Sequence, residues 1–260
     1  KENNPDRVIY LADARQSMHF IQVFRCARKT GIVPDTTELV HIGFGTMNGK
    51  DGKPFKTRDG GVMRLEYLLK EIDDEMLNKI KENQKEKENL NIDEAEAEQT
   101  AKTVALAAVK YGDLSNQASK DYIFDIDRFT SFEGNTGPYI LYTIVRIKSI
   151  LSKYEAKGGD ISALKDAIMP AVNAGQKNLM LSLAKFNATI ESAYEESAPH
   201  KICAYIYELA NAFNGFYHDT KILSEENEEL KKSYISLLVL TKEILEACID
   251  MLGFSAPDRM

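Results

Sequence analysis

The sequence predicts an α/β region of Rossmann type followed by an all-helical bundle. Two short apolar runs, at residues 8–12 and 39–44, have the length of buried strands, and a helical pattern lies between them. Strand, helix and strand in this order are typical of a parallel α/β sheet. From residue 101 onward, apolar residues recur every three or four positions, which is the spacing of amphipathic helices.

The composition is that of a globular protein. Of the 260 residues, 43% are hydrophobic and 28% are charged, and the net charge is −7. These values exclude a disordered chain and a disulfide-rich miniprotein, and no apolar stretch is long enough to span a membrane. The three scattered cysteines, Cys26, Cys203 and Cys248, are expected to be reduced and packed among apolar neighbours, in a cytoplasmic protein without a structural metal.

Each element of the α/β region has a local signal. The helix after Asp13 carries apolar residues three positions apart, from Met18 to Ala27, and Gly31 and Pro34 end it. Because two strands cannot form such a sheet and residue 1 is not Met, the rest of the sheet is expected upstream. A helix is expected over residues 63–77. The predicted domains are therefore residues 1–77, a polar linker or exposed helix at 78–99, and a helical domain at 100–260.

The helical region shows several apolar stripes. The last and clearest helix is expected to begin near Ser224 and to end at Gly253. Its stripe consists of Tyr234, Leu237, Leu238, Thr241, Ile244, Leu245, Cys248, Met251 and Leu252. Two other stripes consist of Val104, Ala108 and Tyr111, and of Leu179, Leu183, Phe186 and Ile190.

A basic loop at residues 49–61 is the first candidate site. Four cationic residues alternate there with glycines, and lysines with accessible backbone N–H groups suit a phosphate ligand. A basic surface hairpin without function is the alternative. The loop follows a strand that ends in Gly43-Phe44-Gly45, so we expect it at the carboxyl edge of the sheet, where α/β sheets bind ligands.

Several segments resemble one enzyme family. Residues 52–57 read GKPFKT, which resembles a degenerate KMSKS signature of class I aminoacyl-tRNA synthetases. Residues 10–16 (YLADARQ), 41–45 (HIGFG) and 56–58 (KTR) resemble arginyl-tRNA synthetases in particular. So do 124–128 (FDIDR), 133–139 (EGNTGPY), 199–210 and 252–260. The fold class is then the α/β end of a class I synthetase catalytic domain followed by an anticodon-binding bundle.

The resemblance implies roles for residues of the first region. Lys53 and Lys56 match the two signature lysines that stabilise the ATP phosphates, although Pro54-Phe55 and Thr57 depart from the signature. Gln16 matches a position that contacts the arginine substrate. The adenine side of the ATP site would consist of His41, Gly43, Phe44 and Gly45. Ordinary helix-start and strand-end structure is the alternative for Gln16 and His41.

One apparent motif is rejected. Residues 41–43 begin like the HIGH signature of the same class, but they lie too close to the lysine loop. The true HIGH segment and the acidic pocket for the arginine guanidinium match nothing in this sequence, so they are expected upstream.

A helix that begins at Pro138 is the candidate for tRNA contact. Ile140, Ile144, Ile147 and Leu151 form its core stripe, and a second stripe carries Tyr139, Tyr142 and Arg146. Two aromatic rings and an arginine off the core face suit stacking on unpaired bases, while packing against a neighbouring helix is the alternative. The resemblance adds Tyr217 and Met260 to the anticodon contacts.

The function expected from the resemblance is that of an arginine–tRNA ligase, of which this chain is a C-terminal portion, inactive alone. Its expected partners are arginine tRNA, arginine and ATP with Mg²⁺, without a membrane, and the enzyme is expected to be a monomer. Two alternatives stay open. One is a noncatalytic tRNA-binding module, and the other is a helical scaffold for proteins that dock on the tyrosine stripe.

Overall fold

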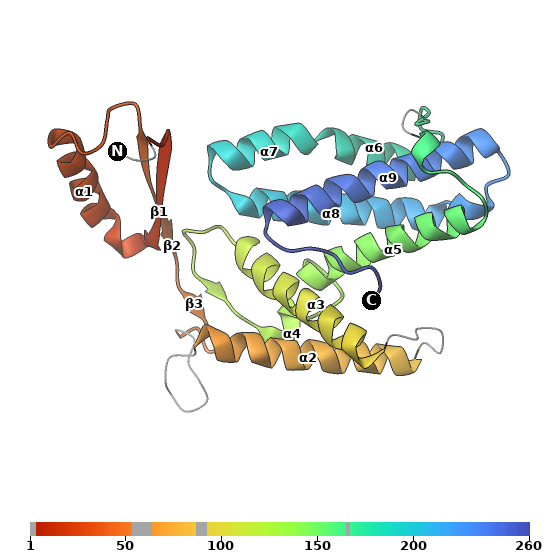
Figure 1. The fold of residues 1–260 in the computed structure, drawn as a ribbon, viewed down its shortest axis with the longest axis horizontal. Coiled ribbons are helices and arrows are strands. Elements are labelled where there is room, and N and C mark those ends of the chain that lie inside the picture. Colours follow the sequence, from red (N-terminus) through yellow and green to blue (C-terminus); the bar gives the residue numbers. More distant parts are fainter. Residues whose placement is uncertain (1–3, 54–63, 87–92, 165–166) are drawn as a thin grey trace. The chain divides into compact units, whose positions relative to one another are not determined.

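The computed structural model describes residues 4–53, 64–86, 93–164 and 167–260, and its elements are labelled in Figure 1. The chain forms two compact units. Unit 1 combines Lys1–Val62 with Asn116–Phe124, and unit 2 combines Met63–Ser115 with Asp125–Met260.

Unit 1 contains the predicted strand–helix–strand arrangement. Strand β1 (Arg7–Asp13) pairs in parallel with β2 (Glu38–Phe44), and the register runs from Arg7 opposite Glu38 to Asp13 opposite Phe44. The 3-10 turn η1 (Ala14–Gln16) and helix α1 (Ser17–Lys29) connect the two strands. A parallel pair requires such a crossover, so the prediction of a parallel βαβ unit is confirmed.

Helix α1 packs on the strands through aromatic rings. The ring centroids of Phe20 and Phe24 lie 5.3 and 5.4 Å from that of Tyr10. Cys26 is exposed, so the prediction that it packs among apolar neighbours was wrong. The reason is that Cys26 follows Phe24 by two residues, which turns its side chain about 200° away around the helix.

A second pair of short strands holds the start of the basic loop. Strand β3 (Met47–Asn48) pairs in parallel with β4 (Tyr122–Ile123). Just before β3, the Gly45 N–H donates to the carbonyl of Ala118 over 2.9 Å. A Cβ on Gly45 would lie 2.4 Å from the carbonyl carbon of Lys120, so only glycine allows the two backbones to approach this closely.

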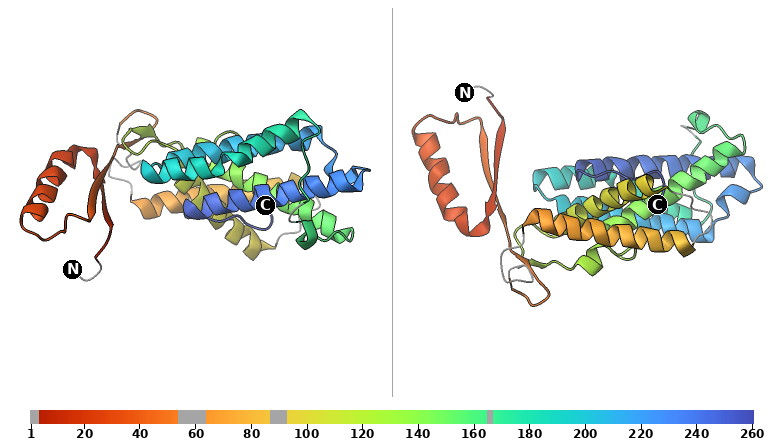
Figure 2. Two further views of the ribbon diagram at one scale, coloured as in Figure 1. Left: turned by 90° about the horizontal axis from the view of Figure 1, so that it is seen from above. Right: turned by 60° about the horizontal axis from the view of Figure 1, so that its bottom comes forward.

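Unit 2 begins with two long helices that lie against each other, as Figure 2 also shows. They are α2 (Leu65–Glu86) and α3 (Glu94–Leu114), and the Asp93 side chain caps α3 by accepting from the Glu96 N–H. The buried residues of α2 are Leu68, Ile72, Met76 and Ile80. Helix α2 continues past residue 77 into the stretch predicted as a polar linker or exposed helix, and its buried apolar residues recur every fourth position.

The other elements of unit 2 surround α8 and α5. In chain order they are α4 (Ile126–Phe129), α5 (Gly137–Ala156), η2 (Ser162–Leu164), α6 (Ala174–Ala184), α7 (Phe186–Glu195), α8 (Pro199–Asp219), η3 (Ile222–Ser224) and α9 (Glu228–Met251). Helices α6 and α7 pack on α8, and α5 contacts α3, α8 and α9. The predicted core stripe of α5 is buried, as are Val104, Ala108 and Tyr111 of α3.

Two helix boundaries differ from the sequence prediction. Asn227, not Ser224, caps α9, since its side chain accepts from the N–H groups of Glu229 and Leu230. Ser224 lies in η3 instead. The stripe from Leu179 to Ile190 crosses a break at Lys185, which separates α6 from α7, so Leu179 and Leu183 are buried while Phe186 and Ile190 are half-buried.

Candidate functional site

The carboxyl ends of β1 and β2 carry most of the first predicted site. A Cβ on Gly43 would lie 2.8 Å from the Cα of Ala14, so the end of β2 lies directly against the turn that follows β1. Gln16 ends that turn and is exposed. Phe44, the last residue of β2, is 43% exposed. The structure therefore brings Gln16, Gly43, Phe44 and Gly45 to one edge of the strands.

An aspartate fixes the turn between β1 and α1. The Asp13 carboxylate accepts from the Arg15 backbone N–H over 2.8 Å and from the Arg15 Nε over 2.9 Å. These hydrogen bonds from Arg15 lower the pKa of Asp13 to about 2. The carboxylate therefore stays ionised at neutral pH and orders the backbone that leads to Gln16.

His41 lies on the side of the sheet that faces α1. Its ring stacks on Phe20, with centroids 4.4 Å apart and planes 14° from parallel. Its Nε2 is buried and has no hydrogen-bond partner among the described residues. The His41 ring is thus part of the packing between β2 and α1, whereas Gly43 and Phe44 lie at the open end of the strand.

Lys53, the first of the two signature lysines, ends a tight turn of the basic loop. The Gly49 N–H donates to the carbonyl of Lys53 over 2.8 Å, and the Gly52 N–H donates to the carbonyl of Gly49 over 2.9 Å. Gly52 has a φ of 72°, which favours glycine. The Lys53 side chain is exposed, while the second lysine, Lys56, lies outside the described residues.

The second predicted site forms a cluster between α5 and α8, which we call the aromatic–arginine cluster. It contains Tyr139, Tyr142 and Arg146 of α5, together with Tyr207, Asn211, Asn214 and Tyr217 of α8. The guanidinium carbon of Arg146 lies 4.6 Å from the centroid of the Tyr142 ring and 5.4 Å from that of Tyr217. Both distances are within the range of a cation–π interaction.

A chain of hydrogen bonds crosses the same cluster. Arg146 Nη1 donates to Asn214 Oδ1 over 2.6 Å, and Asn214 Nδ2 donates to the Tyr139 hydroxyl over 2.8 Å. That hydroxyl donates to Asn211 Oδ1 over 2.7 Å. Tyr139 and Arg146 are therefore fixed against α8, all three residues predicted on α5 are half-buried, and Tyr217 is 38% exposed.

Of the partners on α8, the sequence analysis named Tyr217 but missed Tyr207, Asn211 and Asn214. Tyr207, Asn211, Asn214 and Tyr217 follow each other at spacings of four, three and three residues, so they share one face of the helix. The Tyr207 ring lies 5.7 Å from the Tyr139 ring, nearly perpendicular to it. A search for polar and aromatic residues at helical spacing would have found this face.

The C-terminal tail, with Met260, is held by cations from α3 and α5. Lys110 donates to the carbonyl of Gly253. Lys148 Nζ donates to the carbonyl of Pro257 over 3.2 Å and to the Asp258 carboxylate over 3.2 Å. Arg259 forms an ion pair with Glu96, with 3.0 Å between Nη2 and Oε1. Met260 itself is half-buried.

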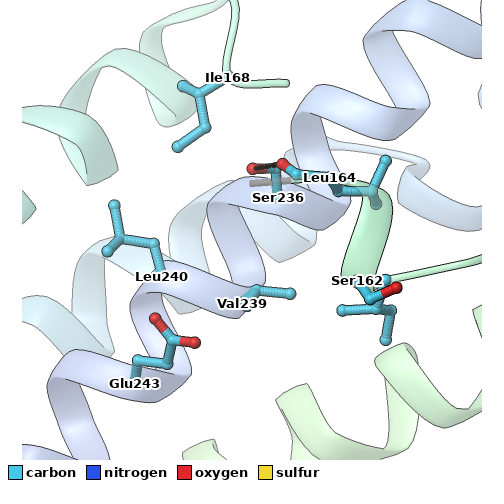
Figure 3. A pocket seen from close by; sticks show the side chains of 8 residues that line it. Ser162, Leu164, Ile168, Ser236, Val239, Leu240 and Glu243 are labelled. Carbon is cyan, nitrogen blue, oxygen red and sulfur yellow. Dashed lines mark hydrogen bonds between the residues drawn. The ribbon is translucent and has the colours of Figure 1, made fainter. Parts of the chain in front are cut away.

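A pocket of about 460 Å³ lies elsewhere in unit 2, between α9 and the segment around η2 (Figure 3). Its walls are mainly apolar, with Ser236 and Glu243 on α9 as polar members, and Ser236 Oγ donates to the carbonyl of Leu164 over 2.8 Å. Among the described residues, those that line this pocket include none of the residues predicted for a site.

Comparisons with known proteins match both regions of the chain. The family model described as tRNA synthetases class I (R), catalytic domain, matches residues 1–126, and the DALR anticodon binding domain matches residues 140–260. Over its full length the chain is 54% identical to the arginine–tRNA ligase of Alkaliphilus oremlandii (strain OhILAs). Both regions of the chain thus match arginyl-tRNA synthetases. The fold class predicted from the sequence is thereby confirmed.

Further arginyl-tRNA synthetases are similar to this chain. The arginine–tRNA ligase of Francisella tularensis subsp. tularensis (strain WY96-3418) is 43% identical over 262 residues. The chain spans 43% of the length of both of these relatives. The arginyl-tRNA synthetase structure from Plasmodium falciparum has a TM-score of 0.80 at 27% identity and covers 99% of this chain and 42% of its own. That from Thermus thermophilus has a TM-score of 0.80 at 25% identity, with coverages of 98% and 41%.

The structure also gives two findings on the described part of the chain. No helix there is both long and apolar enough to cross a bilayer. Within the same residues, no group of three or more His, Cys, Asp or Glu side chains is arranged to hold a metal ion.

Proposed function

We propose that this chain is part of an arginine–tRNA ligase. Such an enzyme joins the arginine carboxylate to the α-phosphate of ATP with release of pyrophosphate. It then transfers the arginyl group from the adenylate to the terminal ribose of arginine tRNA, and AMP leaves. Unit 1 would contribute to the ATP and arginine site, and unit 2 would bind the anticodon region. This proposal is supported by 54% identity to an arginine–tRNA ligase over the whole chain.

In unit 1, charge and open backbone suit the adenylation step. Lys53 and Lys56 would stabilise the negative charge that develops on the ATP phosphates, since preorganised cations lower the barrier of such a step. Gly43, Phe44 and Gly45 would border the adenine with an exposed ring and backbone without side chains, and His41 would support them through its packing on Phe20. Gln16 would hydrogen-bond the arginine substrate.

The metal and the remaining partners are part of the same proposal. ATP would enter as its Mg²⁺ complex, and Mg²⁺ held mainly by phosphates and water needs few protein carboxylates. The enzyme would act as a monomer in the cytoplasm, as the family resemblance implies. The catalytic step would require parts of the enzyme beyond this chain, because the HIGH segment and the acidic arginine pocket match nothing in it.

In unit 2, the aromatic–arginine cluster carries the proposal. Tyr142 and Tyr217 offer ring faces, and Arg146 lies between them with a positive charge that suits phosphate or a base edge. Tyr139 and the terminal Met260 would add to this surface. Packing accounts for part of these contacts, but it does not require a cation between two partly accessible rings.

Two measurements test the proposal. The chain is titrated with arginine tRNA and with an unrelated tRNA at two salt concentrations, and preference for arginine tRNA that persists at the higher salt is expected. Equal affinity for both tRNAs would instead favour a protein scaffold. An enzyme that contains this chain together with the HIGH segment and the acidic arginine pocket, here called the longer enzyme, should catalyse arginine-dependent ATP–pyrophosphate exchange with tRNA present. The 260-residue chain alone should not. A long form that binds arginine tRNA but gives no exchange would be the noncatalytic binding module.

A further inference from the structure

Asn214 is the central member of the aromatic–arginine cluster, although no motif in the sequence singles it out. Its side-chain amide touches both Arg146 and Tyr139, the two α5 residues at the ends of the predicted stripe. The residue is half-buried on α8, between Asn211 and Tyr217. It is therefore the contact through which α8 determines the position of the α5 side chains.

Arg146 determines the direction of each hydrogen bond in the series that runs through Asn214 and Tyr139 to Asn211. A guanidinium only donates, so the oxygen of Asn214 must face it and the NH₂ group must face Tyr139. The Tyr139 hydroxyl then accepts a hydrogen bond from Asn214 and donates its own hydrogen to Asn211. Tyr139 consequently has no hydroxyl proton left for a ligand, and its ring is the part that can contact one.

The neutral amide also affects the charge of the cluster. A carboxylate in place of Asn214 would fix Arg146 equally well, but it would compensate the positive charge. An amide acceptor orients the guanidinium and leaves its charge uncompensated. Held in this way, the guanidinium lies against both the Tyr142 and the Tyr217 rings.

We propose that Asn214 is a positioning residue for tRNA binding, which holds Arg146 across the Tyr142 and Tyr217 rings and leaves its charge available to the tRNA. This inference rests on the proposed function of unit 2. Asn214 acts through Arg146, so removing the amide should matter only while Arg146 is present.

The test measures the affinity for arginine tRNA of Asn214→Leu, which keeps the size of the side chain without its hydrogen-bonding groups. We expect affinity about tenfold weaker than that of the unchanged protein. In an Arg146→Ala background, the same substitution should produce little further loss, because the two residues act as one unit. Asn187→Leu is the matched control, since Asn187 is exposed on α7 and lies outside the cluster, and its affinity should stay within about twofold.

Asn214→Asp tests the role of charge. It keeps an acceptor for Arg146 but adds a negative charge, so binding should weaken and the dependence of affinity on salt should become shallower. Affinity and salt dependence equal to those of the unchanged protein would overturn this part of the proposal.

Other outcomes separate the inference from the proposed function. Suppose that the unchanged protein prefers arginine tRNA. If Asn214→Leu then binds this tRNA equally well, or if the losses of affinity caused by Asn214→Leu and Arg146→Ala simply add, Asn214 does not position Arg146, while the proposed function still holds. If the unchanged protein does not discriminate between tRNAs, the proposed function fails first. Circular dichroism of each variant, with affinity calculated per folded molecule, removes the effect of unfolding.

Discussion

The guanidinium carbon of Arg146 lies 4.6 Å above the Tyr142 ring, which belongs to the preceding turn of the same helix. The two side chains are four residues apart, so α5 alone brings them together. Tyr217 of α8 approaches the same guanidinium from a second helix, at 5.4 Å. A cation fixed between two rings gives a surface on which a flat base and its phosphate can both be bound.

The first prediction concerns Tyr142. Tyr142→Ala is expected to weaken binding of arginine tRNA by roughly 1–3 kcal/mol, the usual contribution of stacking on one base. Fluorescence titration with labelled tRNA measures the change. Tyr194→Ala is the matched control, because Tyr194 is 73% exposed on α7 and lies outside the cluster. If Tyr142→Ala unfolds while its affinity per folded molecule stays the same, the tyrosine serves packing alone.

The second prediction concerns the exposed lysine of the tight turn. In the longer enzyme, Lys53→Ala should reduce the rate of arginine-dependent ATP–pyrophosphate exchange by about 10²- to 10³-fold, which is typical for loss of a group that stabilises charge in the transition state. Binding of tRNA to unit 2 should not change. Lys120→Ala, in the segment that passes Gly45, is the control cation. An exchange rate within about twofold of normal for Lys53→Ala would remove this residue from the catalytic step.

The third prediction compares two glycines in unit 2. A Cβ on Gly137 would lie 2.3 Å from the carbonyl oxygen of Ala107, so Gly137→Ala should force α5 away from α3 and cost about 1–3 kcal/mol of unfolding free energy. Gly215 has open space around it within α8, so Gly215→Ala should stabilise the protein by up to about 1 kcal/mol. Urea unfolding of both variants measures the difference. Equal stabilities would contradict the close approach of α5 to α3.

The fourth prediction concerns the three thiols. Burial raises the pKa of Cys203 and of Cys248 from the ordinary 9.0 to about 12, whereas Cys26 is exposed. Ellman's reagent should therefore modify one thiol quickly in the native protein and all three after denaturation. Cys26→Ser should abolish the fast reaction. Fast modification of two or more thiols would mean that the core around α8 and α9 opens readily.

The same burial gives a dependence of stability on alkaline pH. Below about pH 9 both thiols are protonated in the folded and the unfolded chain, so they add no pH dependence there. As the pH rises from 9 toward 12, the unfolded chain loses these protons before the folded chain does, so the free energy of unfolding should fall. Comparing the pH profile of urea unfolding with that of Cys203→Ala tests the effect, and the slope should become shallower in the variant.

Local sequence patterns predicted the helices and strands whose apolar residues follow an unbroken period or run. The α5 stripe of Ile140, Ile144 and Ile147 is buried because a regular 3.6-residue period places it on one face. The parallel pair β1 and β2 followed from the order of apolar runs. Strands β3 and β4 could not be predicted in this way, since each has two residues and their pairing joins segments far apart in the chain.

The candidate sites were predicted to different extents. Helical spacing brought Tyr139, Tyr142 and Arg146 to one side of α5, but it could not reveal that the partner of that side is α8. Hydrogen bonds such as that between Arg146 and Asn214 join residues 68 positions apart, so they depend on how the helices pack. The burial of Ile80 in α2 was missed for a related reason, because its polar neighbours concealed a sparse apolar face.

Residues 116–124 belong to unit 1, although the chain on both sides of them belongs to unit 2, and this affects how the two units can be separated. The chain leaves unit 2 after Ser115 and returns at Asp125, so the two units are joined by three covalent connections. A protease that cuts only one of them would divide the chain into two fragments, at least one of which would still contain parts of both units. A shortened gene that starts at residue 63 would produce a bundle in which β4 has lost its partner strand β3. Circular permutation or deletion of residues 116–124 would therefore be the better way to isolate the helices.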